Sequence, residues 1–173
     1  ENWAMQPEVL KMYAKHYKTG DIIPQELIDK IDNSRFFNQG FETLEYIAAS
    51  LLDMDWHVIT DTEAKDVIQF ERESITKMGL IQQIWPRYLT TNFIHIATWG
   101  YESGYYSYLW SAVLDSDAFE SFMENGLFDK ATAESFRQNI LSKGGSEDPM
   151  ELYIKFKGRK PMVDALLKKR GLN

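Results

Sequence analysis

The chain of 173 residues contains no cysteine and only three histidines. The absence of cysteine excludes disulfide bonds and thiolate metal ligands, and it leaves a cytoplasmic and a periplasmic location equally open. No apolar run is long enough to span a bilayer, and no signal-peptide pattern is visible. Acidic residues outnumber basic ones by 26 to 19, which gives a net charge of −7 and argues against the basic face that nucleic-acid binding requires. The sequence therefore predicts neither a membrane partner nor a nucleic-acid partner.

The patterns of the common hydrolytic sites are also missing. A zinc-binding helix needs two histidines four residues apart with a glutamate between them, whereas His16, His57 and His95 are far apart in the sequence. Three scattered histidines could still meet in space, but no complete metal site is visible. A Gly-x-Ser-x-Gly turn is absent, and Gly100 and Gly104 lack the Lys-Ser/Thr ending of a phosphate loop.

What the sequence does have is helical periodicity almost throughout. No strand alternation, internal repeat or low-complexity linker appears, so we predict a single all-α unit over residues 1–173. Helix starts are expected where an aspartate can cap the first turn: at Asp61 with Thr62, at Asp115 or Asp117, at Asp129, and at Asp148 with Pro149. The predicted helices cover approximately residues 7–17, 24–31, 41–59, 61–79, 103–114, 117–125 and 129–140, another begins at 149, and the last covers 161–171.

Two pairs of carboxylates were considered as acid/base pairs. Asp53 and Asp55 are two residues apart, as are Asp115 and Asp117, so the members of each pair face different sides of a helix. Solvated faces or helix caps explain them better than general acid/base chemistry does. His16 and His57 are expected at partly exposed helical positions.

The stretch from His95 to Trp110 is the most unusual part of the chain. Tyr101, Tyr105 and Tyr108 have i, i+4, i+7 spacing, which on a helix would place their hydroxyl groups on one face. Buried phenols need hydrogen-bond partners, so the same residues suit either an aromatic core or a polar cleft. The neighbouring His95 and the two glycines, which would let another chain approach closely, favour the cleft.

Several ordered motifs in this chain resemble those of the M3 family of zinc metallopeptidases, and most closely its bacterial peptidyl-dipeptidase branch. The resemblance covers nearly the whole sequence. The segments that carry it are Glu1–Trp3, Lys15–Gly20, Phe37–Phe41, Arg87–Tyr88, His95 with Gly100–Trp110, Ile140–Asp148, Phe156–Pro161 and Lys169–Leu172.

This resemblance implies that the chain is the all-α, C-terminal part of a larger zincin-like oligopeptidase. The family's His-Glu-x-x-His helix and its third zinc ligand, a glutamate, would both lie upstream of Glu1, where zinc would activate water for attack on a peptide carbonyl. We therefore expect zinc in the full-length enzyme and none in this chain. The implied partners are short peptide substrates and the upstream portion of the same polypeptide.

The resemblance also assigns roles to residues of the aromatic stretch. Tyr108 would be catalytic and would donate its phenol to the oxyanion of the tetrahedral intermediate. His95, Tyr101, Tyr105 and Gly100 would bind substrate. Thr98 and Trp99 depart from the run of glycines that is common in the family, and Trp99 is expected to stiffen this loop and to fill space beside the substrate.

Three functions remain open from the sequence. The first is release of C-terminal dipeptides by the parent enzyme, with the isolated chain inactive because it lacks the zinc ligands and the general base. The second is an oligoendopeptidase of the same family, which would differ in how the substrate cleft ends. The third is a helical peptide-binding module without catalysis.

Overall fold

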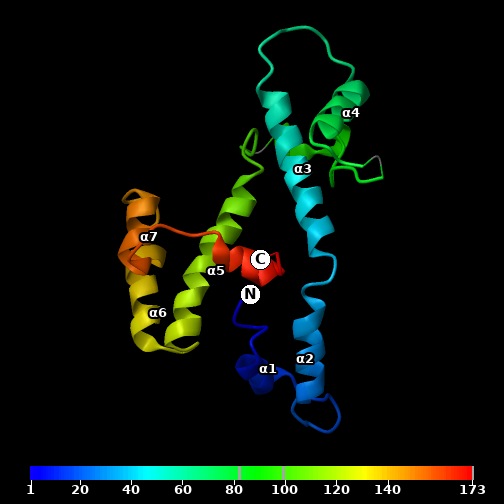
Figure 1. Ribbon diagram of the computed structural model, residues 1–173. Coiled ribbons are helices and arrows are strands. Elements are labelled where there is room, and N and C mark those ends of the chain that lie inside the picture. The colour runs from blue at the N-terminus through cyan, green and yellow to red at the C-terminus, as the bar shows by residue number, and fades with distance from the viewer. Residues whose placement is uncertain (82, 99, 173) are drawn as a thin grey trace. The chain divides into compact units, whose positions relative to one another are not determined.

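The computed structural model describes residues 1–81, 83–98 and 100–172. The regular structure of these residues is helical and contains no strand, and one isolated antiparallel bridge pairs Lys15 with Ile22. The predicted all-α class is therefore confirmed (Figure 1). The α-helices are α1 (Pro7–Tyr13), α2 (Gln25–Ser34), α3 (Gln39–His57), α4 (Val67–Lys77), α5 (Ser107–Asn125), α6 (Lys130–Phe136), α7 (Pro149–Lys157) and α8 (Asp164–Arg170).

Three shorter elements complete the fold. Two 3₁₀ turns, η1 (Thr90–Asn92) and η2 (Ile94–Ile96), precede α5, and a π-helical segment, η3 (Arg137–Leu141), continues α6. Over the described residues, no helix combines the length and the apolar character needed to cross a bilayer. The chain divides into two compact units, one made of Glu1–Phe37 with Ala112–Asn173 and the other of Asn38–Ser111.

Several helix ends follow the local sequence as predicted. The side chain of Asp129 accepts a hydrogen bond from the backbone N–H of Thr132 at 2.7 Å and caps α6. Asp148 accepts from the N–H of Met150 at 2.8 Å, and Pro149 occupies the first turn of α7. Both caps satisfy donors that have no partner inside the helix, which is why these starts can be identified from the sequence.

Other predicted boundaries are wrong because the chain makes different turns. Helix α1 ends at Tyr13 instead of Tyr17, since the backbone reverses and the N–H of Ile23 donates to the carbonyl of Ala14 at 2.9 Å. Helix α4 is capped by Asp66, which accepts from the N–H of Gln69 at 2.9 Å, and not by Asp61.

In the unit formed by Asn38–Ser111, α3 is the central helix. Helix α4 packs along it, with the rings of Trp56 and Phe70 3.9 Å apart and a hydrogen bond of 2.7 Å from Ser74 to Asp55. The buried side chain of Glu71 accepts a hydrogen bond from the backbone N–H of Thr90 and so attaches the segment that leads to η1. The core of this unit brings Ala49 together with Phe93, Ile96 and Tyr105.

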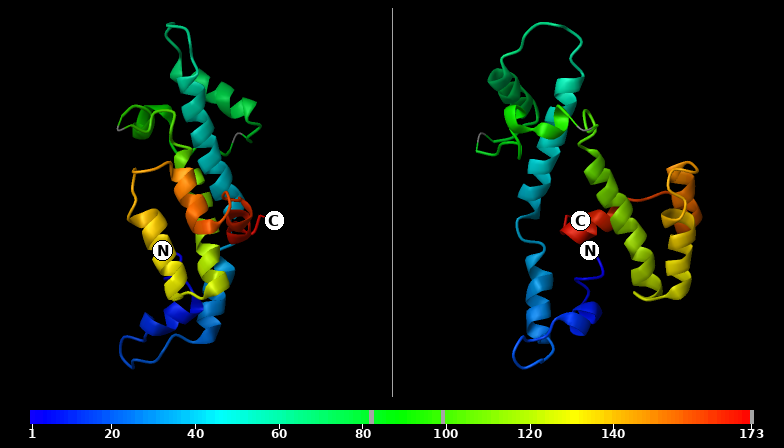
Figure 2. Two further views of the ribbon diagram at one scale, coloured as in Figure 1. Left: turned by 90° about the vertical axis from the view of Figure 1, so that its left-hand side faces the viewer. Right: turned by 180° about the vertical axis from the view of Figure 1, so that it is seen from behind.

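The unit formed by Glu1–Phe37 and Ala112–Asn173 has an aromatic core. Helices α6 and α7 lie beside α5 in each view (Figure 2). Phe122 of α5 is in edge-to-face contact with Phe136 at a ring distance of 6.0 Å, and Phe136 is 5.1 Å from Phe156. Trp3 contacts Phe122 at 4.7 Å, so the start of the chain packs against α5. Such edge-to-face contacts add to the stabilisation from apolar burial.

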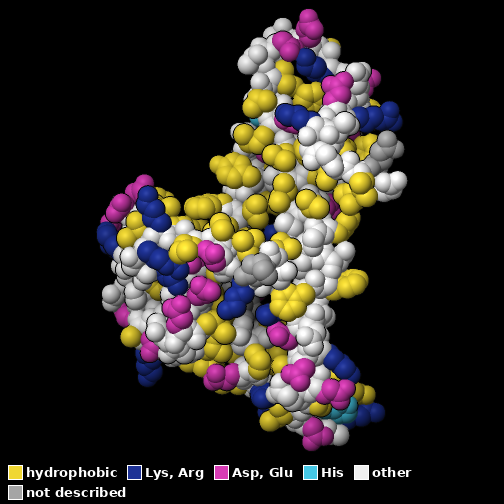
Figure 3. Space-filling view, viewed as in Figure 1, with side chains coloured by type: hydrophobic (Ala, Val, Ile, Leu, Met, Phe, Trp, Pro, Cys, Tyr) yellow, Lys and Arg dark blue, Asp and Glu magenta, His cyan; other side chains and the backbone are white. Residues whose placement is uncertain are grey.

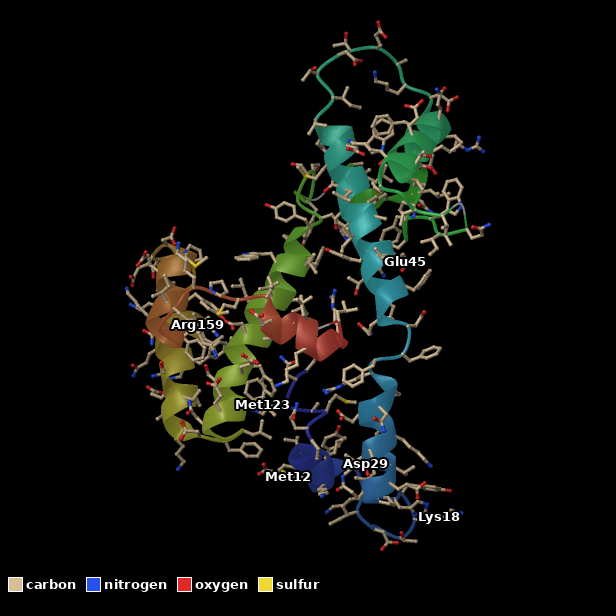
Figure 4. The ribbon with its side chains drawn as sticks, in the orientation of Figure 1. Met12, Lys18, Asp29, Glu45, Met123 and Arg159 are labelled. Carbon is tan, nitrogen blue, oxygen red and sulfur yellow. The ribbon has the colours of Figure 1, made fainter. Side chains whose placement is uncertain are left out.

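A buried carboxylate ties α5 to α7. Asp117 is 1% exposed, and its two oxygens accept hydrogen bonds from Arg159 at 2.7 and 2.9 Å and from the hydroxyl of Tyr153 at 2.5 Å. Arg159 is labelled in Figure 4. Neither Asp115 nor Asp117 caps a helix, because α5 continues through both positions to Asn125. The prediction that they are caps or solvated residues is therefore wrong for Asp117, whose charge is neutralised across the core.

The surroundings of Asp117 set the sign of its titration. Burial alone would raise the pKa of this carboxyl, but the hydrogen bonds and charge of Arg159 and the hydroxyl of Tyr153 outweigh burial and hold the pKa below its usual value. Burial and the neighbouring carboxylate raise the pKa of Tyr153, which therefore stays protonated as the donor. A lowered pKa in the folded state means that this group stabilises the fold above the unfolded-state pKa and loses that effect as the pH falls.

We expect Asp117→Asn to lower the free energy of unfolding by about 3 kcal/mol at pH 7. This is the lower end of the range for breaking a buried pair, since the Arg159 side chain is 39% exposed and keeps part of its hydration. The difference from wild type should shrink as the pH falls below about 4, because Asp117 is protonated first in the unfolded chain and in the folded protein only at the lower pKa. Urea denaturation of both proteins at pH 7 and at a pH below about 4 measures the difference in the free energy of unfolding.

The matched control is Asp32→Asn, which removes an exposed pair with Arg35 on α2. We expect a change within about 0.5 kcal/mol at either pH. A loss in Asp117→Asn that does not vary with pH would contradict the assigned role of the charge.

Candidate aromatic site

His95 is held by buried neighbours on both sides. It lies in the 3₁₀ turn η2, between Phe93, which is 1% exposed, and Ile96, which is 9% exposed. These two apolar side chains anchor the turn in the core of its unit, and the imidazole of His95 remains half-buried. The turn therefore fixes the place of the ring without covering it.

The three predicted tyrosines do not share a helix. Helix α5 begins only at Ser107, and Tyr101 and Tyr105 precede it in a series of turns. Ser103 has a φ of 53°, in the left-handed region, which a helical residue cannot adopt. The predicted helix start at Ser103, and with it the shared helical face, is therefore wrong.

The structure nevertheless brings all four predicted rings together. The ring of His95 lies 5.5 Å from that of Tyr101, 5.3 Å from that of Tyr105 and 6.2 Å from that of Tyr108. Tyr101 stacks on Tyr108 at 5.4 Å with an angle of 8° between the planes, and Tyr105 meets Tyr108 edge-on at 5.5 Å. We call His95, Tyr101, Tyr105 and Tyr108 the aromatic site.

Asp53 of α3 holds the turns that carry these rings. Its carboxylate is fully buried and accepts hydrogen bonds from the backbone N–H groups of Ser103 and Tyr105, each at 3.0 Å. The Nδ1 atom of His57 lies 3.0 Å from Oδ1 of the same carboxylate. The hydroxyl of Tyr46, which lies about two turns before Asp53 on the same face of α3, donates to the carbonyl of Tyr105.

The prediction that Asp53 is solvated or a helix cap is wrong, because the residue is buried and satisfies backbone donors just before the start of α5. One signal was available: Asp53 lies between Leu52 and Met54 in an apolar helix, and a buried charge must have hydrogen-bond partners.

Tyr105 is the buried member of the aromatic site. It is 3% exposed, stacks on Tyr46 at 5.1 Å and meets Phe93 edge-on at 4.8 Å. Burial raises the pKa of its phenol, and the charge of the nearby Arg87 opposes this increase. The core interpretation therefore applies to Tyr105, whose ring supports those of His95 and Tyr108.

Tyr108 is the accessible member, with 42% of its surface exposed. Hydrogen bonding with the Tyr101 side chain raises the pKa of Tyr108 to about 12, with smaller contributions from desolvation and the neighbouring phenols. The hydroxyl of Tyr108 is consequently protonated near neutral pH. A neutral phenol at the surface, with its ring held by stacking, can donate a hydrogen bond to an anionic oxygen.

The glycines of this segment serve the backbone conformation. Gly100 has a φ of 76°, which favours glycine, and a Cβ at this position would meet open space. At Gly104 a Cβ would approach the carbonyl oxygen of Tyr101 to 3.3 Å, so the turn itself is tight there. Trp99, expected to stiffen this loop, lies outside the described residues.

The residues of this chain do not fit a zinc ion. Among the described residues, no group of three or more histidine and carboxylate side chains is placed to hold a metal. The ring of His57 contacts Asp53, and that of His16, which follows α1 in a turn instead of lying within a helix, is 3.1 Å from the hydroxyl of Thr19. His95 is in contact with the aromatic rings of Tyr101 and Tyr105.

Comparison with known proteins gives a consistent result. The sequence model of peptidase family M3 matches residues 1–172. The chain is 41% identical to dipeptidyl carboxypeptidase of Escherichia coli over 175 residues, covering 100% of this chain and 26% of that protein. It is 38% identical to oligopeptidase A of Escherichia coli and 29% identical to saccharolysin of Saccharomyces cerevisiae, covering 99% of this chain and 25% and 24% of those proteins. The chain thus spans about a quarter of the length of the curated relatives it matches.

The contact between Tyr101 and Tyr108 can be tested by titration. In Tyr101→Phe the stacked ring remains but the hydroxyl is lost, so we expect the pKa of Tyr108 to fall from about 12 toward the ordinary value of about 10. NMR of ¹³Cζ-labelled tyrosine between about pH 9 and pH 12 follows the ionisation of Tyr108 directly.

Tyr106→Phe is the matched control, because Tyr106 is 54% exposed and neighbours Tyr105 in sequence. This substitution should leave the titration of Tyr108 unchanged. An unaltered pKa in Tyr101→Phe would mean that the Tyr101 hydroxyl does not stabilise the neutral phenol.

Proposed function

Because the chain belongs to peptidase family M3, we propose that residues 1–173 form the C-terminal portion of the catalytic region of a zinc-dependent peptidase that hydrolyses short peptides. The relatives support this proposal, since each is a peptidase about four times longer than this chain. The zinc ligands and the general base would lie in the upstream portion of the same polypeptide. Zinc would supply an activated water there, and the residues of this chain would act on the substrate.

The aromatic site is the substrate-binding part of this proposal. The observation that carries it is the exposed, neutral Tyr108, whose ring is stacked on Tyr101 and surrounded by His95 and Tyr105. Negative charge develops on the carbonyl oxygen of a scissile peptide bond in the transition state, and a positioned donor stabilises that charge. Tyr108 would be this catalytic donor.

The other members of the site would act on the substrate around the reacting carbonyl. His95 and Tyr101 are half-buried, and each presents a polar group beside Tyr108 that could bind the peptide backbone or a terminal carboxylate. Gly100, exposed and without a side chain, would allow the peptide to lie against the backbone. Tyr105 would line the site from the core side and keep the rings of His95 and Tyr108 in place.

Within the family, we propose release of C-terminal dipeptides, which is supported by the 41% identity to a dipeptidyl carboxypeptidase. The second candidate is an oligoendopeptidase, supported by the 38% identity to oligopeptidase A. The two differ in whether a free C-terminal carboxylate is needed. Mass spectrometry of products from a free and a C-terminally amidated peptide, digested by the full-length protein, separates them.

Dipeptide release that requires the free carboxylate would support the first candidate. Internal cleavage of both peptides would support the endopeptidase. Absence of hydrolysis, together with an upstream sequence that lacks the His-Glu-x-x-His helix, would leave a helical peptide-binding module as the function.

Tyr108→Phe in the full-length protein tests the proposed donor. We expect kcat to fall by about 10²–10³, because the oxyanion exists only in the transition state, while KM changes little. Steady-state kinetics on a fluorogenic peptide measure both constants.

Tyr106→Phe again serves as the control and should leave kcat within about twofold of wild type, since Tyr106 makes no ring contact with the aromatic site. An unchanged kcat in Tyr108→Phe would remove this residue from the mechanism.

A further inference from the structure

Helix α3 has one face that is buried within its own unit. Ala49 and Leu52 are 0% exposed, as is Asp53, whose carboxylate holds the turns of the aromatic site. Tyr46 and Trp56 lie on the same face and pack against the core of this unit. This face of α3 is therefore committed to positioning the tyrosines.

The opposite face is apolar as well. One stripe along this face consists of four residues of α3 and its C-cap residue, spaced three and four apart: Leu44, Ile47, Leu51, Met54 and the C-cap Val58. The exposed fractions are 47% for Leu44, 45% for Leu51, 37% for Met54 and 63% for Val58. At 100° per residue, the centre of this stripe is about half a turn away from Leu52 and Asp53. We call these five residues the outer stripe of α3.

The outer stripe lacks the features of a surface in contact with water. None of its five members is charged, whereas the solvent side of a surface helix normally carries charged and polar residues. The four acidic residues of the helix, Glu42, Glu45, Asp53 and Asp55, lie outside the stripe; Glu45 is labelled in Figure 4. Figure 3 shows hydrophobic side chains at the surface over α3. A helix that is apolar on both faces is typical of one packed between two layers.

We propose that the upstream portion of the same polypeptide packs on the outer stripe of α3 through an apolar face of its own. This inference rests on the proposed function, because it takes the chain to be one part of a longer peptidase. The relatives are about four times the length of this chain, so about three quarters of such a polypeptide is available to cover the stripe. That occupant is present in every molecule at high effective concentration, whereas a second copy of the chain has no comparable support.

This arrangement gives α3 a defined part in the enzyme. Its inner face fixes the backbone of Ser103 and Tyr105 through Asp53, and its outer face would contact the portion that carries the zinc ligands. One rigid helix would then set the position of Tyr108 relative to the reacting carbonyl. Rigid elements hold catalytic groups more accurately than loops do.

Photo-crosslinking in the full-length protein tests the proposal. p-Benzoylphenylalanine replaces Leu51 in one variant and Leu44, which is 47% exposed, in a second, so that a failure of one variant to fold does not decide the result. The control places the same residue at Arg72, on the exposed polar face of α4. Circular dichroism checks folding, and mass spectrometry identifies the crosslinked peptides.

We expect both stripe variants to crosslink within one polypeptide to segments upstream of Glu1, and the Arg72 variant to give at least tenfold less of this product. Crosslinks between two polypeptides would overturn the proposal in favour of self-association. Crosslinks confined to residues 1–173, or none in well-folded variants, would overturn it as well.

Peptide hydrolysis by the wild-type full-length protein separates this inference from the proposed function. An active peptidase whose stripe does not crosslink upstream would retain the proposed function and lose the inference. Upstream crosslinks in a protein that hydrolyses no peptide would support the interface and contradict the peptidase assignment.

Discussion

The aromatic site depends on one buried carboxylate. Asp53 accepts hydrogen bonds from the backbone N–H groups of Ser103 and Tyr105, and no other side chain of α3 reaches both in the described structure. Because a buried charge is costly unless its hydrogen bonds are made, these turns and α3 must form together. The left-handed backbone at Ser103 is stabilised by the same contact, and it directs the chain so that Tyr101 stacks on Tyr108.

This constraint explains how two tyrosines in turns and one in a helix come to share a surface. The i, i+4, i+7 spacing predicts a shared helical face, and this explanation is wrong because Tyr101 and Tyr105 precede α5. The rings are nevertheless close to one another, as predicted. The outcome divides the three phenols by environment. Tyr105 is a core residue with a pKa raised by burial, whereas Tyr108 is accessible and its pKa is raised mainly by hydrogen bonding with Tyr101. Tyr108 is the most exposed phenol of the three, which is why it is the donor in the proposed function.

Membership of peptidase family M3 relates the aromatic site to the metal-binding residues that this chain lacks among its described residues. The described residues offer no metal-binding group, and the chain spans about a quarter of its relatives. In the proposed function, the aromatic site is the substrate-binding half of a peptidase site, and the metal-binding half lies upstream. The outer stripe of α3 is also incomplete by itself, because an exposed apolar helix face is normally covered by a second layer of structure.

The sequence by itself determined the helical class, the family, and the helix starts at Asp129 and Asp148. The class and the family follow from patterns repeated along the whole chain. Each of the two helix starts follows from a capping carboxylate and the N–H groups just after it. The burial of Asp53 and Asp117 was decided only by the tertiary structure. Their partners are 50 and 52 residues away for Asp53 and 36 and 42 residues away for Asp117, and local periodicity carries no information on such distant contacts. The same long-range packing brings the rings of the aromatic site into contact. Apolar burial in the core and the hydrogen bonds of Asp53 join residues that are far apart in the sequence, so local patterns do not predict this contact.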